Sequence, residues 1–153
     1  ALMHIDLFSD PVSNIGEAFD SFYDIMQDFE KEYVKMLTTA MKCGLDTTVC
    51  TIYNPCFEYN ESDRIINLLP SKTILGQLQK RAMVALPIFN DIIFQEAFKF
   101  GLPVMDLRLI FNHESDYANP IEPSAVGGMK MAKIIKQIAY NHNFSLKNSV
   151  VFT

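Results

Sequence analysis

The sequence has no apolar run long enough to cross a membrane. A membrane-spanning helix needs about 20 consecutive apolar residues, and the nearest candidate, residues 83–94, is interrupted by Pro87 and Asn90. The first residues carry no basic stretch and are broken by Asp6 and Asp10, so we expect no secretory signal peptide. These absences predict a cytoplasmic protein without a membrane span.

Cysteine and basic residues are also scarce. Cys43, Cys50 and Cys56 lack Cys-x-x-Cys spacing and have no histidine at ligand spacing, so we expect no metal centre. We expect mostly buried thiols of an intracellular protein rather than one disulfide plus one free thiol. Lys and Arg number 13 against 18 Asp and Glu, giving a net charge of −5. This balance argues against a nucleic-acid partner, because phosphate recognition needs clustered basic side chains.

The residues that are present suit one folded domain. The chain has 153 residues, of which 49% are hydrophobic, and a domain of this size buries about 70% of its unfolded surface. No internal repeat or long linker divides residues 1–153. Gly127 and Gly128 lack the spacing of a phosphate-binding loop, so we expect no cofactor.

The first long periodic segment predicts a helix over residues 14–43. Asn14 and Glu17 are spaced as a capping box, and Gly44 is placed to end the helix. Acidic residues populate the faces away from the apolar stripe. Apolar residues recur every three or four positions and predict one buried stripe, made of Ile15, Phe19, Phe22, Met26, Phe29, Tyr33, Leu37 and Ala40.

Two further helices are expected later in the chain. One runs from about residue 75 or 79 to residue 100, where Pro87 either kinks the helix or marks the start of a new one. The other follows Ser124, a suitable N-cap, and ends near residue 141. Its expected buried face contains Met131, Ala132, Ile135 and Ile138, and its expected solvent face contains Lys130, Lys133 and Lys136.

The β-rich segments over residues 47–53 and 103–110 predict two strands, and residues 150–152 suit a short edge strand. Residues 54–72 and 111–123 are expected to be loops. Strands separated by helical crossovers pair in parallel, so we expect an α/β fold. Two confident strands are too few to cover three amphipathic helices, because a parallel sheet needs both faces covered. The pattern therefore predicts that the complete fold contains further strands.

The loop over residues 111–123 is the candidate site, since ligands of open α/β sheets bind beyond the carboxyl ends of the strands. It contains His113 and Asp116, and it ends with Asn119 and Glu122 before a helix. His113 is a candidate general base, and Asn54 follows the other strand. The same residue types are also ordinary caps and turns, and a carboxylate such as Glu122 can simply stabilise a helix N-terminus.

Five segments together resemble the SGNH/GDSL hydrolase family, specifically its C-terminal half. They are the strand over residues 48–55, Phe-Asn-Asp-Ile-Ile over residues 89–93, the strand over residues 104–108, Asn-Pro-Ile-Glu-Pro-Ser over residues 119–124, and the glycines and alanine of residues 127–132. The resemblance implies a three-layer, flavodoxin-like fold with a parallel sheet, to which this chain supplies the C-terminal strands and helices.

This sequence departs from the family where the catalytic Asp and His are expected. The family pattern is Asp-x-x-His-Pro, whereas this chain has Asn119 and Glu122 at those positions. The family's Gly-Asp-Ser turn, oxyanion-hole glycine and Gly-x-Asn-Asp loop do not occur in the 153 residues. The resemblance therefore implies that the serine and the first strands belong to an N-terminal segment of the same fold, supplied by a preceding segment or by a separate chain.

The family hydrolyses esters by serine attack, with a histidine base and an oxyanion hole. Carboxylates are weaker bases than imidazole by about two pKa units, so three outcomes are open. Glu122 is an unusual base, or His113 or Asp116 replaces the histidine, or the site binds without turnover. The leading hypothesis is an SGNH-like hydrolase acting on a small ester or acyl substrate. The alternatives are a non-catalytic binding domain of the same fold and an unrelated flavodoxin-like module that binds a partner.

Overall fold

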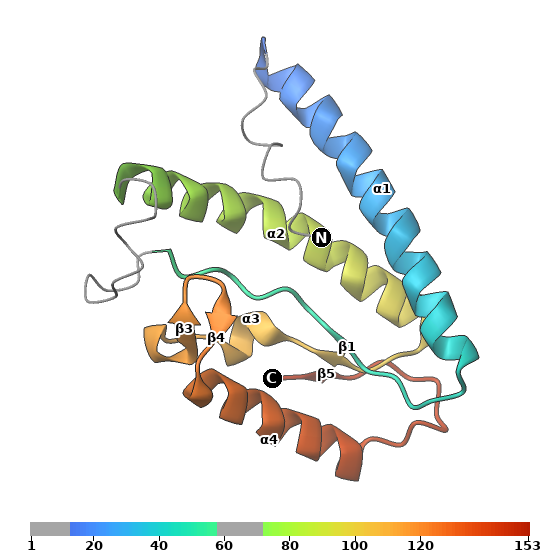
Figure 1. Ribbon diagram of the computed structural model, residues 1–153. Coiled ribbons are helices and arrows are strands. Elements are labelled where there is room, and N and C mark those ends of the chain that lie inside the picture. Colours follow the sequence, from blue (N-terminus) through green and yellow to red (C-terminus); the bar gives the residue numbers. More distant parts are fainter. Residues whose placement is uncertain (1–12, 58–71) are drawn as a thin grey trace.

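The computed structural model describes residues 13–57 and 72–153 (Figure 1). The start of the chain and the predicted loop beyond residue 57 lie outside the described residues. The elements follow the order helix, strand, helix, strand, two short helical turns, hairpin, helix and strand. The helices are α1 (Ile15–Lys42), α2 (Lys72–Phe100), α3 (Leu107–Ile110) and α4 (Ala125–Asn141), with a short 3-10 turn, η3 (Glu114–Asp116), between α3 and the hairpin.

Three short strands form a parallel sheet in the order β1-β2-β5. They are β1 (Val49–Cys50), β2 (Val104–Met105) and β5 (Val151–Phe152). β2 is central: Val104 pairs with Val49 on one side and with Val151 on the other. The α/β class and the edge strand at the C-terminal end are therefore confirmed, with β1 as the second edge of the described sheet.

Helices cover both faces of the sheet, which makes three layers (Figure 1). Val104 points into the cluster formed with α1 and α2, which includes Leu37, Ile93 and Ala97. The next residue, Met105, points into the opposite cluster, formed with Ile110, Phe111, Tyr117, Ile134 and Ile138. This alternation follows from the two-residue period of a strand, and it divides the core into an α1/α2 layer and an α4 layer.

The N-terminus of α1 is capped as the sequence predicts, with one difference. The Asn14 Oδ1 atom accepts the Glu17 amide at 3.0 Å, but the Glu17 carboxylate bonds to Ser13 rather than to the Asn14 backbone. Gly44, at φ +68°, follows the last turn, a left-handed conformation that favours glycine. The predicted buried stripe is wrong at its beginning, because Ile15 and Phe19 are 76% and 64% exposed.

The second predicted strand, residues 103–110, is wrong beyond β2. After Met105 the Asp106 side chain accepts the Arg108 amide at 3.2 Å and caps α3, because a side-chain acceptor at this position satisfies an amide that a helical turn would leave unpaired. α2 begins earlier than predicted and continues through Pro87, and residues 111–123 contain η3 and a hairpin rather than only loop.

Two predictions of burial are also corrected. On α4, Ile134 and Ile138 face the core, whereas Ile135 is 54% exposed and Ala132 is exposed. The core-facing stripe therefore lies one residue from the position assigned to Ile135. The three cysteines form no disulfide bond, as predicted, but they are not mainly buried: Cys43 and Cys50 are exposed, and Cys56 is half-buried.

Candidate functional site

Asn119 and Glu122 meet on a small antiparallel hairpin formed by β3 (Tyr117–Asn119) and β4 (Glu122–Pro123). The Asn119 Oδ1 atom accepts the backbone amides of Ile121 and Glu122, both at 3.0 Å. These two bonds fix the amide plane, so that Nδ2 donates to the Glu122 Oε2 atom at 2.6 Å. The structure thus brings the two principal candidate residues together, with the exposed Glu122 carboxylate oriented by a held amide.

The segment after β1 holds the hairpin in place. The Tyr53 hydroxyl donates to the Ile121 carbonyl at 2.6 Å, and the Cys56 amide donates to the Pro120 carbonyl at 2.8 Å. In the opposite sense, the Tyr117 hydroxyl donates to the Asn54 carbonyl at 2.7 Å. Asn54 therefore supports the hairpin through its backbone, and the segments that follow β1 and β2 meet at the carboxyl ends of these strands.

Burial and negative charge affect both tyrosines of this contact. Burial raises the pKa of Tyr53, and the nearby Glu122 carboxylate raises it further. Burial is also the main cause that raises the pKa of Tyr117 to about 12, with smaller contributions from Cys56, Tyr53 and Asp116. Both phenols are therefore neutral donors at neutral pH, which is what the bonds to the carbonyls require.

Asp116 supports the hairpin from within and does not face the candidate base. Its side chain is fully buried, and its Oδ2 atom accepts the Asn112 and His113 amides and the Lys130 ammonium, the last at 2.7 Å. Burial alone would raise the pKa of Asp116, but the Lys130 bond and the two amides outweigh it and lower the pKa. The buried Oδ1 atom has no hydrogen-bond partner in the described structure.

The start of α4 is fixed against the same loop. The Ser124 amide donates to the Asp116 carbonyl at 2.8 Å, and its hydroxyl donates to the Ser115 carbonyl at 2.5 Å. Ser124 is the N-cap, since its Oγ atom accepts the Val126 and Gly127 amides. This confirms the predicted cap, and the first amides of the helix are satisfied by Ser124 rather than by the Glu122 carboxylate.

His113 lies apart from the Asn119–Glu122 pair in the hydrogen-bond pattern. It is exposed and forms the N-cap of η3, with its Nδ1 atom 2.9 Å from the Ser115 hydroxyl and 3.2 Å from the Ser115 amide. These contacts are local to the turn. The structure therefore gives His113 a capping role.

A second polar cluster lies where β1 and β2 end, and the sequence patterns did not single it out. The Thr51 hydroxyl donates to Asp106 Oδ1 at 2.8 Å and accepts the Leu107 amide at 2.8 Å. The Arg108 guanidinium holds both oxygens of Asp106, at 2.8 and 2.7 Å, and also lies over the Phe94 ring. Burial opposes ionisation of Asp106, yet the bonds from Arg108 and Thr51 lower its pKa.

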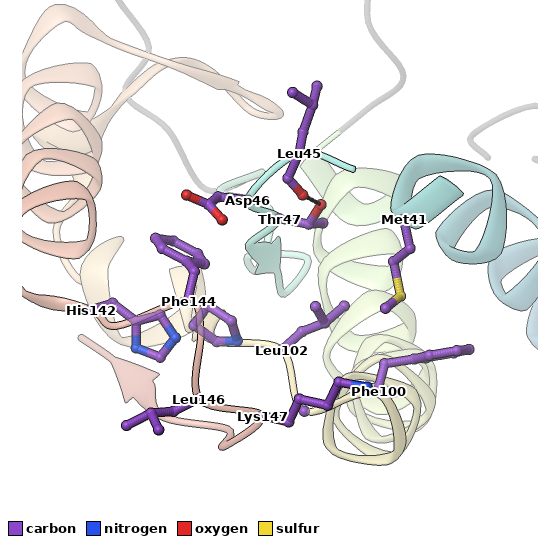
Figure 2. Close-up of a pocket in the computed structure, with 12 residues that line it drawn as sticks. Met41, Leu45, Asp46, Thr47, Phe100, Leu102, His142, Phe144, Leu146 and Lys147 are labelled. Atoms are coloured by element: carbon purple, nitrogen blue, oxygen red, sulfur yellow. Dashed lines mark hydrogen bonds between the residues drawn. The ribbon is translucent and has the colours of Figure 1, made fainter. Parts of the chain in front are cut away.

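A cavity of about 140 Å³ lies at the opposite, amino ends of the strands (Figure 2). Its walls come from the end of α1, from the segments before β1 and β2, and from the segment between α4 and β5. They are largely apolar, with Asp46, Thr47, His142 and Lys147 as polar members. None of the candidate residues lines this cavity, so the cavity and the Asn119–Glu122 pair are separate features of the fold.

Within residues 13–57 and 72–153, no group of three or more His, Cys, Asp or Glu side chains is arranged to hold a metal ion. No helix in this described part is long and apolar enough to cross a membrane. Comparison of the chain with protein-family models, with curated proteins and with solved structures found no match.

Proposed function

We propose that this chain is the C-terminal part of an SGNH-like hydrolase domain that cleaves a small ester or acyl substrate. In this proposal Glu122 is the general base, Asn119 orients it, and the serine nucleophile comes from outside these residues. The observation that carries the proposal is the 2.6 Å bond from Asn119 Nδ2 to Glu122 Oε2 on an exposed hairpin. In serine hydrolases, a third side chain orients the general base in the same way.

The proton transfer requires a free carboxylate oxygen. Asn119 occupies Oε2, which leaves Oε1 to accept the serine proton as the hydroxyl attacks the acyl carbon. The same group then returns the proton to the leaving alcohol, and a water repeats the sequence to release the acid. This transfer moves the negative charge from Glu122 to the oxygen of the tetrahedral intermediate. The proposal therefore still needs an oxyanion hole, which must come from the same outside segment as the serine.

The sheet edge supports the contribution of a second segment. The amides of Val49 in β1 and of Thr51 directly after it donate to carbonyls of the β2 segment, at 3.1 Å each. Because the peptide groups of a strand alternate in direction, the peptide groups of Cys50 point away from β2. Cys50 is exposed, so a further parallel strand has an available partner at this edge.

The test is ester hydrolysis by the natural polypeptide that carries these residues, using p-nitrophenyl acetate and butyrate. Glu122→Gln is expected to lower kcat at least about 100-fold, the lower range for removal of a general base. Glu114→Gln, a charge-matched change on the adjacent exposed turn, is the control and is expected to retain activity. Full activity of Glu122→Gln would overturn the assignment of the base.

A second candidate function is binding without catalysis, within the same fold. The observation that favours it is the presence of Asn119 and Glu122 where the family pattern has Asp and His. A fluorophosphonate probe separates the two proposals, because it labels an activated serine regardless of the natural substrate. Labelling supports the hydrolase, whereas no labelling together with no ester hydrolysis supports the binding domain.

A further inference from the structure

The charges of α1 and α4, the helices on opposite faces of the sheet, differ in sign. α1 carries six acidic and three basic side chains, whereas α4 carries three lysines and no acidic residue. The sheet lies between these two helices (Figure 1), so α4, whose charged side chains are all basic, lies on the opposite face of the sheet from the acidic helix α1. A chain with a net charge of −5 thus presents one locally basic face. Because charges more than about 10 Å apart are screened at moderate salt, a partner at this face interacts mainly with the local lysines.

The outer face of α4 combines these lysines with large apolar side chains. The residues at positions 126, 129, 133, 136 and 140 follow three- and four-residue spacing, so they form one ridge. Val126, Met129 and Tyr140 are 42%, 66% and 79% exposed, and the Lys136 ammonium lies 5.9 Å from the centre of the Tyr140 ring. We call this set the α4 ridge; it lies opposite the buried side that contains Ile134 and Ile138.

Lys130 is not part of the ridge, and this difference is informative. Its ammonium bonds to Asp116, to the Asn112 side chain and to the Ile110 carbonyl. These internal bonds account for a lysine at this position without an external partner. In contrast, Lys133 and Lys136 make no ion pair with any residue in the described structure. The two lysines that project outward therefore keep their charge available to a partner.

We propose that the α4 ridge docks on an anionic lipid surface. A helix with lysines among exposed apolar side chains suits the membrane interface, where the apolar groups enter the headgroup region and the lysines remain with the phosphates. Tyr140 fits the same boundary, since its ring is apolar and its hydroxyl is polar. The inference is independent of the hydrolase proposal, because it uses none of the candidate catalytic residues.

Charge complementarity also suggests a second copy as partner, but the arrangement on α1 fits less well. The exposed residues Ile15 and Phe19 continue the stripe that faces α2, whereas Asp20, Asp24 and Asp28 follow a four-residue spacing along another side of the helix. The acidic groups and exposed apolar groups of α1 are thus on different sides. The α4 ridge has both kinds of group on one side, as a lipid surface requires.

The test is sedimentation of the full chain with vesicles of mixed phosphatidylserine and phosphatidylcholine, compared with pure phosphatidylcholine. Binding is expected only to the mixed vesicles and is expected to weaken with salt. Lys133→Glu with Lys136→Glu is expected to weaken binding at least about 30-fold, since each lysine near an anionic surface contributes about fivefold. Lys31→Glu with Lys35→Glu on α1 makes the same change in net charge and is the control.

Met129→Ser probes insertion separately from charge. We expect it to weaken binding about tenfold, because an inserted Met side chain gains from leaving water. Equal binding to both vesicle types, or equal loss in the control and ridge variants, would overturn the proposal. Light scattering without vesicles tests whether the chain self-associates. If the chain self-associates, the ridge variant abolishes this and no vesicle binding is seen, the ridge binds a second copy and the lipid proposal is overturned.

Discussion

The two layers that cover the sheet are joined to it in different ways. The α4 layer is fixed by directional polar contacts, including Lys130 with Asp116 and Tyr53 with Ile121, around an aromatic cluster. The α1/α2 layer is held to the sheet mainly by apolar packing, as of Leu37 and Ile93 with Val104. Within this layer, Phe22 and Phe29 of α1 meet the Phe89 ring edge-on. The first turns of α1 extend beyond this packing, since Ile15 is 76% exposed.

This difference shows how one sheet can support two kinds of surface. Hydrogen bonds and ion pairs depend strongly on geometry, so the α4 layer fixes the hairpin that carries Asn119 and Glu122. Apolar packing is less directional, and the α1/α2 layer carries no part of that hairpin. We therefore expect substitutions to cost most stability where α4 meets the loop and least at the start of α1.

The largest effect is expected at Gly127. A Cβ atom placed there would lie 2.2 Å from the Asp116 carbonyl oxygen and 2.8 Å from the Phe111 ring. The backbone must move to relieve this overlap, so Gly127→Ala is expected to lower the free energy of unfolding by about 3 kcal/mol, measured by urea denaturation.

The neighbouring glycine is the matched control. A Cβ atom at Gly128 meets nothing within 4 Å, and alanine favours a helix over glycine by up to about 1 kcal/mol. Gly128→Ala is therefore expected to stabilise the chain. If both substitutions shifted the urea midpoint equally, the close approach of α4 to the loop would be contradicted.

An intermediate effect is expected from Asp116. Asp116→Asn breaks the ion pair with Lys130, whose side chain is 37% exposed. We expect this substitution to lower the free energy of unfolding by about 2 kcal/mol at neutral pH, which is less than for a fully buried pair.

The stabilisation by the Asp116 carboxylate is expected to depend on pH. Because the folded-state pKa of Asp116 is lowered, its contribution is present above the unfolded-state value near 4 and is lost as the pH falls through the folded-state pKa. The difference in stability between wild type and Asp116→Asn should therefore shrink below about pH 4. A difference that stayed constant down to pH 2 would exclude this charge as its origin.

The smallest effects are expected along α1 and should grade with position. Phe29 is partly buried between Tyr33 and Phe89, so Phe29→Ala is expected to cost about 1.5 kcal/mol, below the range for fully buried aromatic residues. Phe19 is 64% exposed, and Phe19→Ala is expected to change stability by less than about 0.5 kcal/mol. Equal costs at the two positions would show that the start of α1 is covered.

Helices could be predicted from the sequence because their signals are local. The apolar spacing, Asn14, Gly44 and Ser124 placed α1 and α4 within a few residues of their observed bounds. The strand over residues 103–110 was overextended, since whether Asp106 continues a strand or caps a helix depends on Thr51 and Arg108. The hairpin was predicted as a loop because its strands have only three and two residues with an irregular register.

The candidate site shows the same division. Asn119 and Glu122 could be named from the sequence because both lie in one short motif of the resemblance, three residues apart. The Asp116–Lys130 pair spans 14 positions between a loop and a helix, a separation that carries no periodic signal. Lys130 was accordingly predicted to line a solvent face, whereas its ammonium in fact secures the loop.

Asn90 has a consequence for the outer edge of β1. Fully buried on α2, it accepts the Ile52 amide at 2.7 Å and donates to the Ile52 carbonyl at 2.8 Å. The side-chain amide thus occupies both ladder positions that a neighbouring backbone would use. Any strand that joins this edge can pair with the peptide groups of Cys50, but it cannot pair with those of Ile52 and must leave the edge before that residue. One buried asparagine therefore limits how far a further strand can pair along β1. It forces that strand to diverge from β1 in the direction of the candidate site.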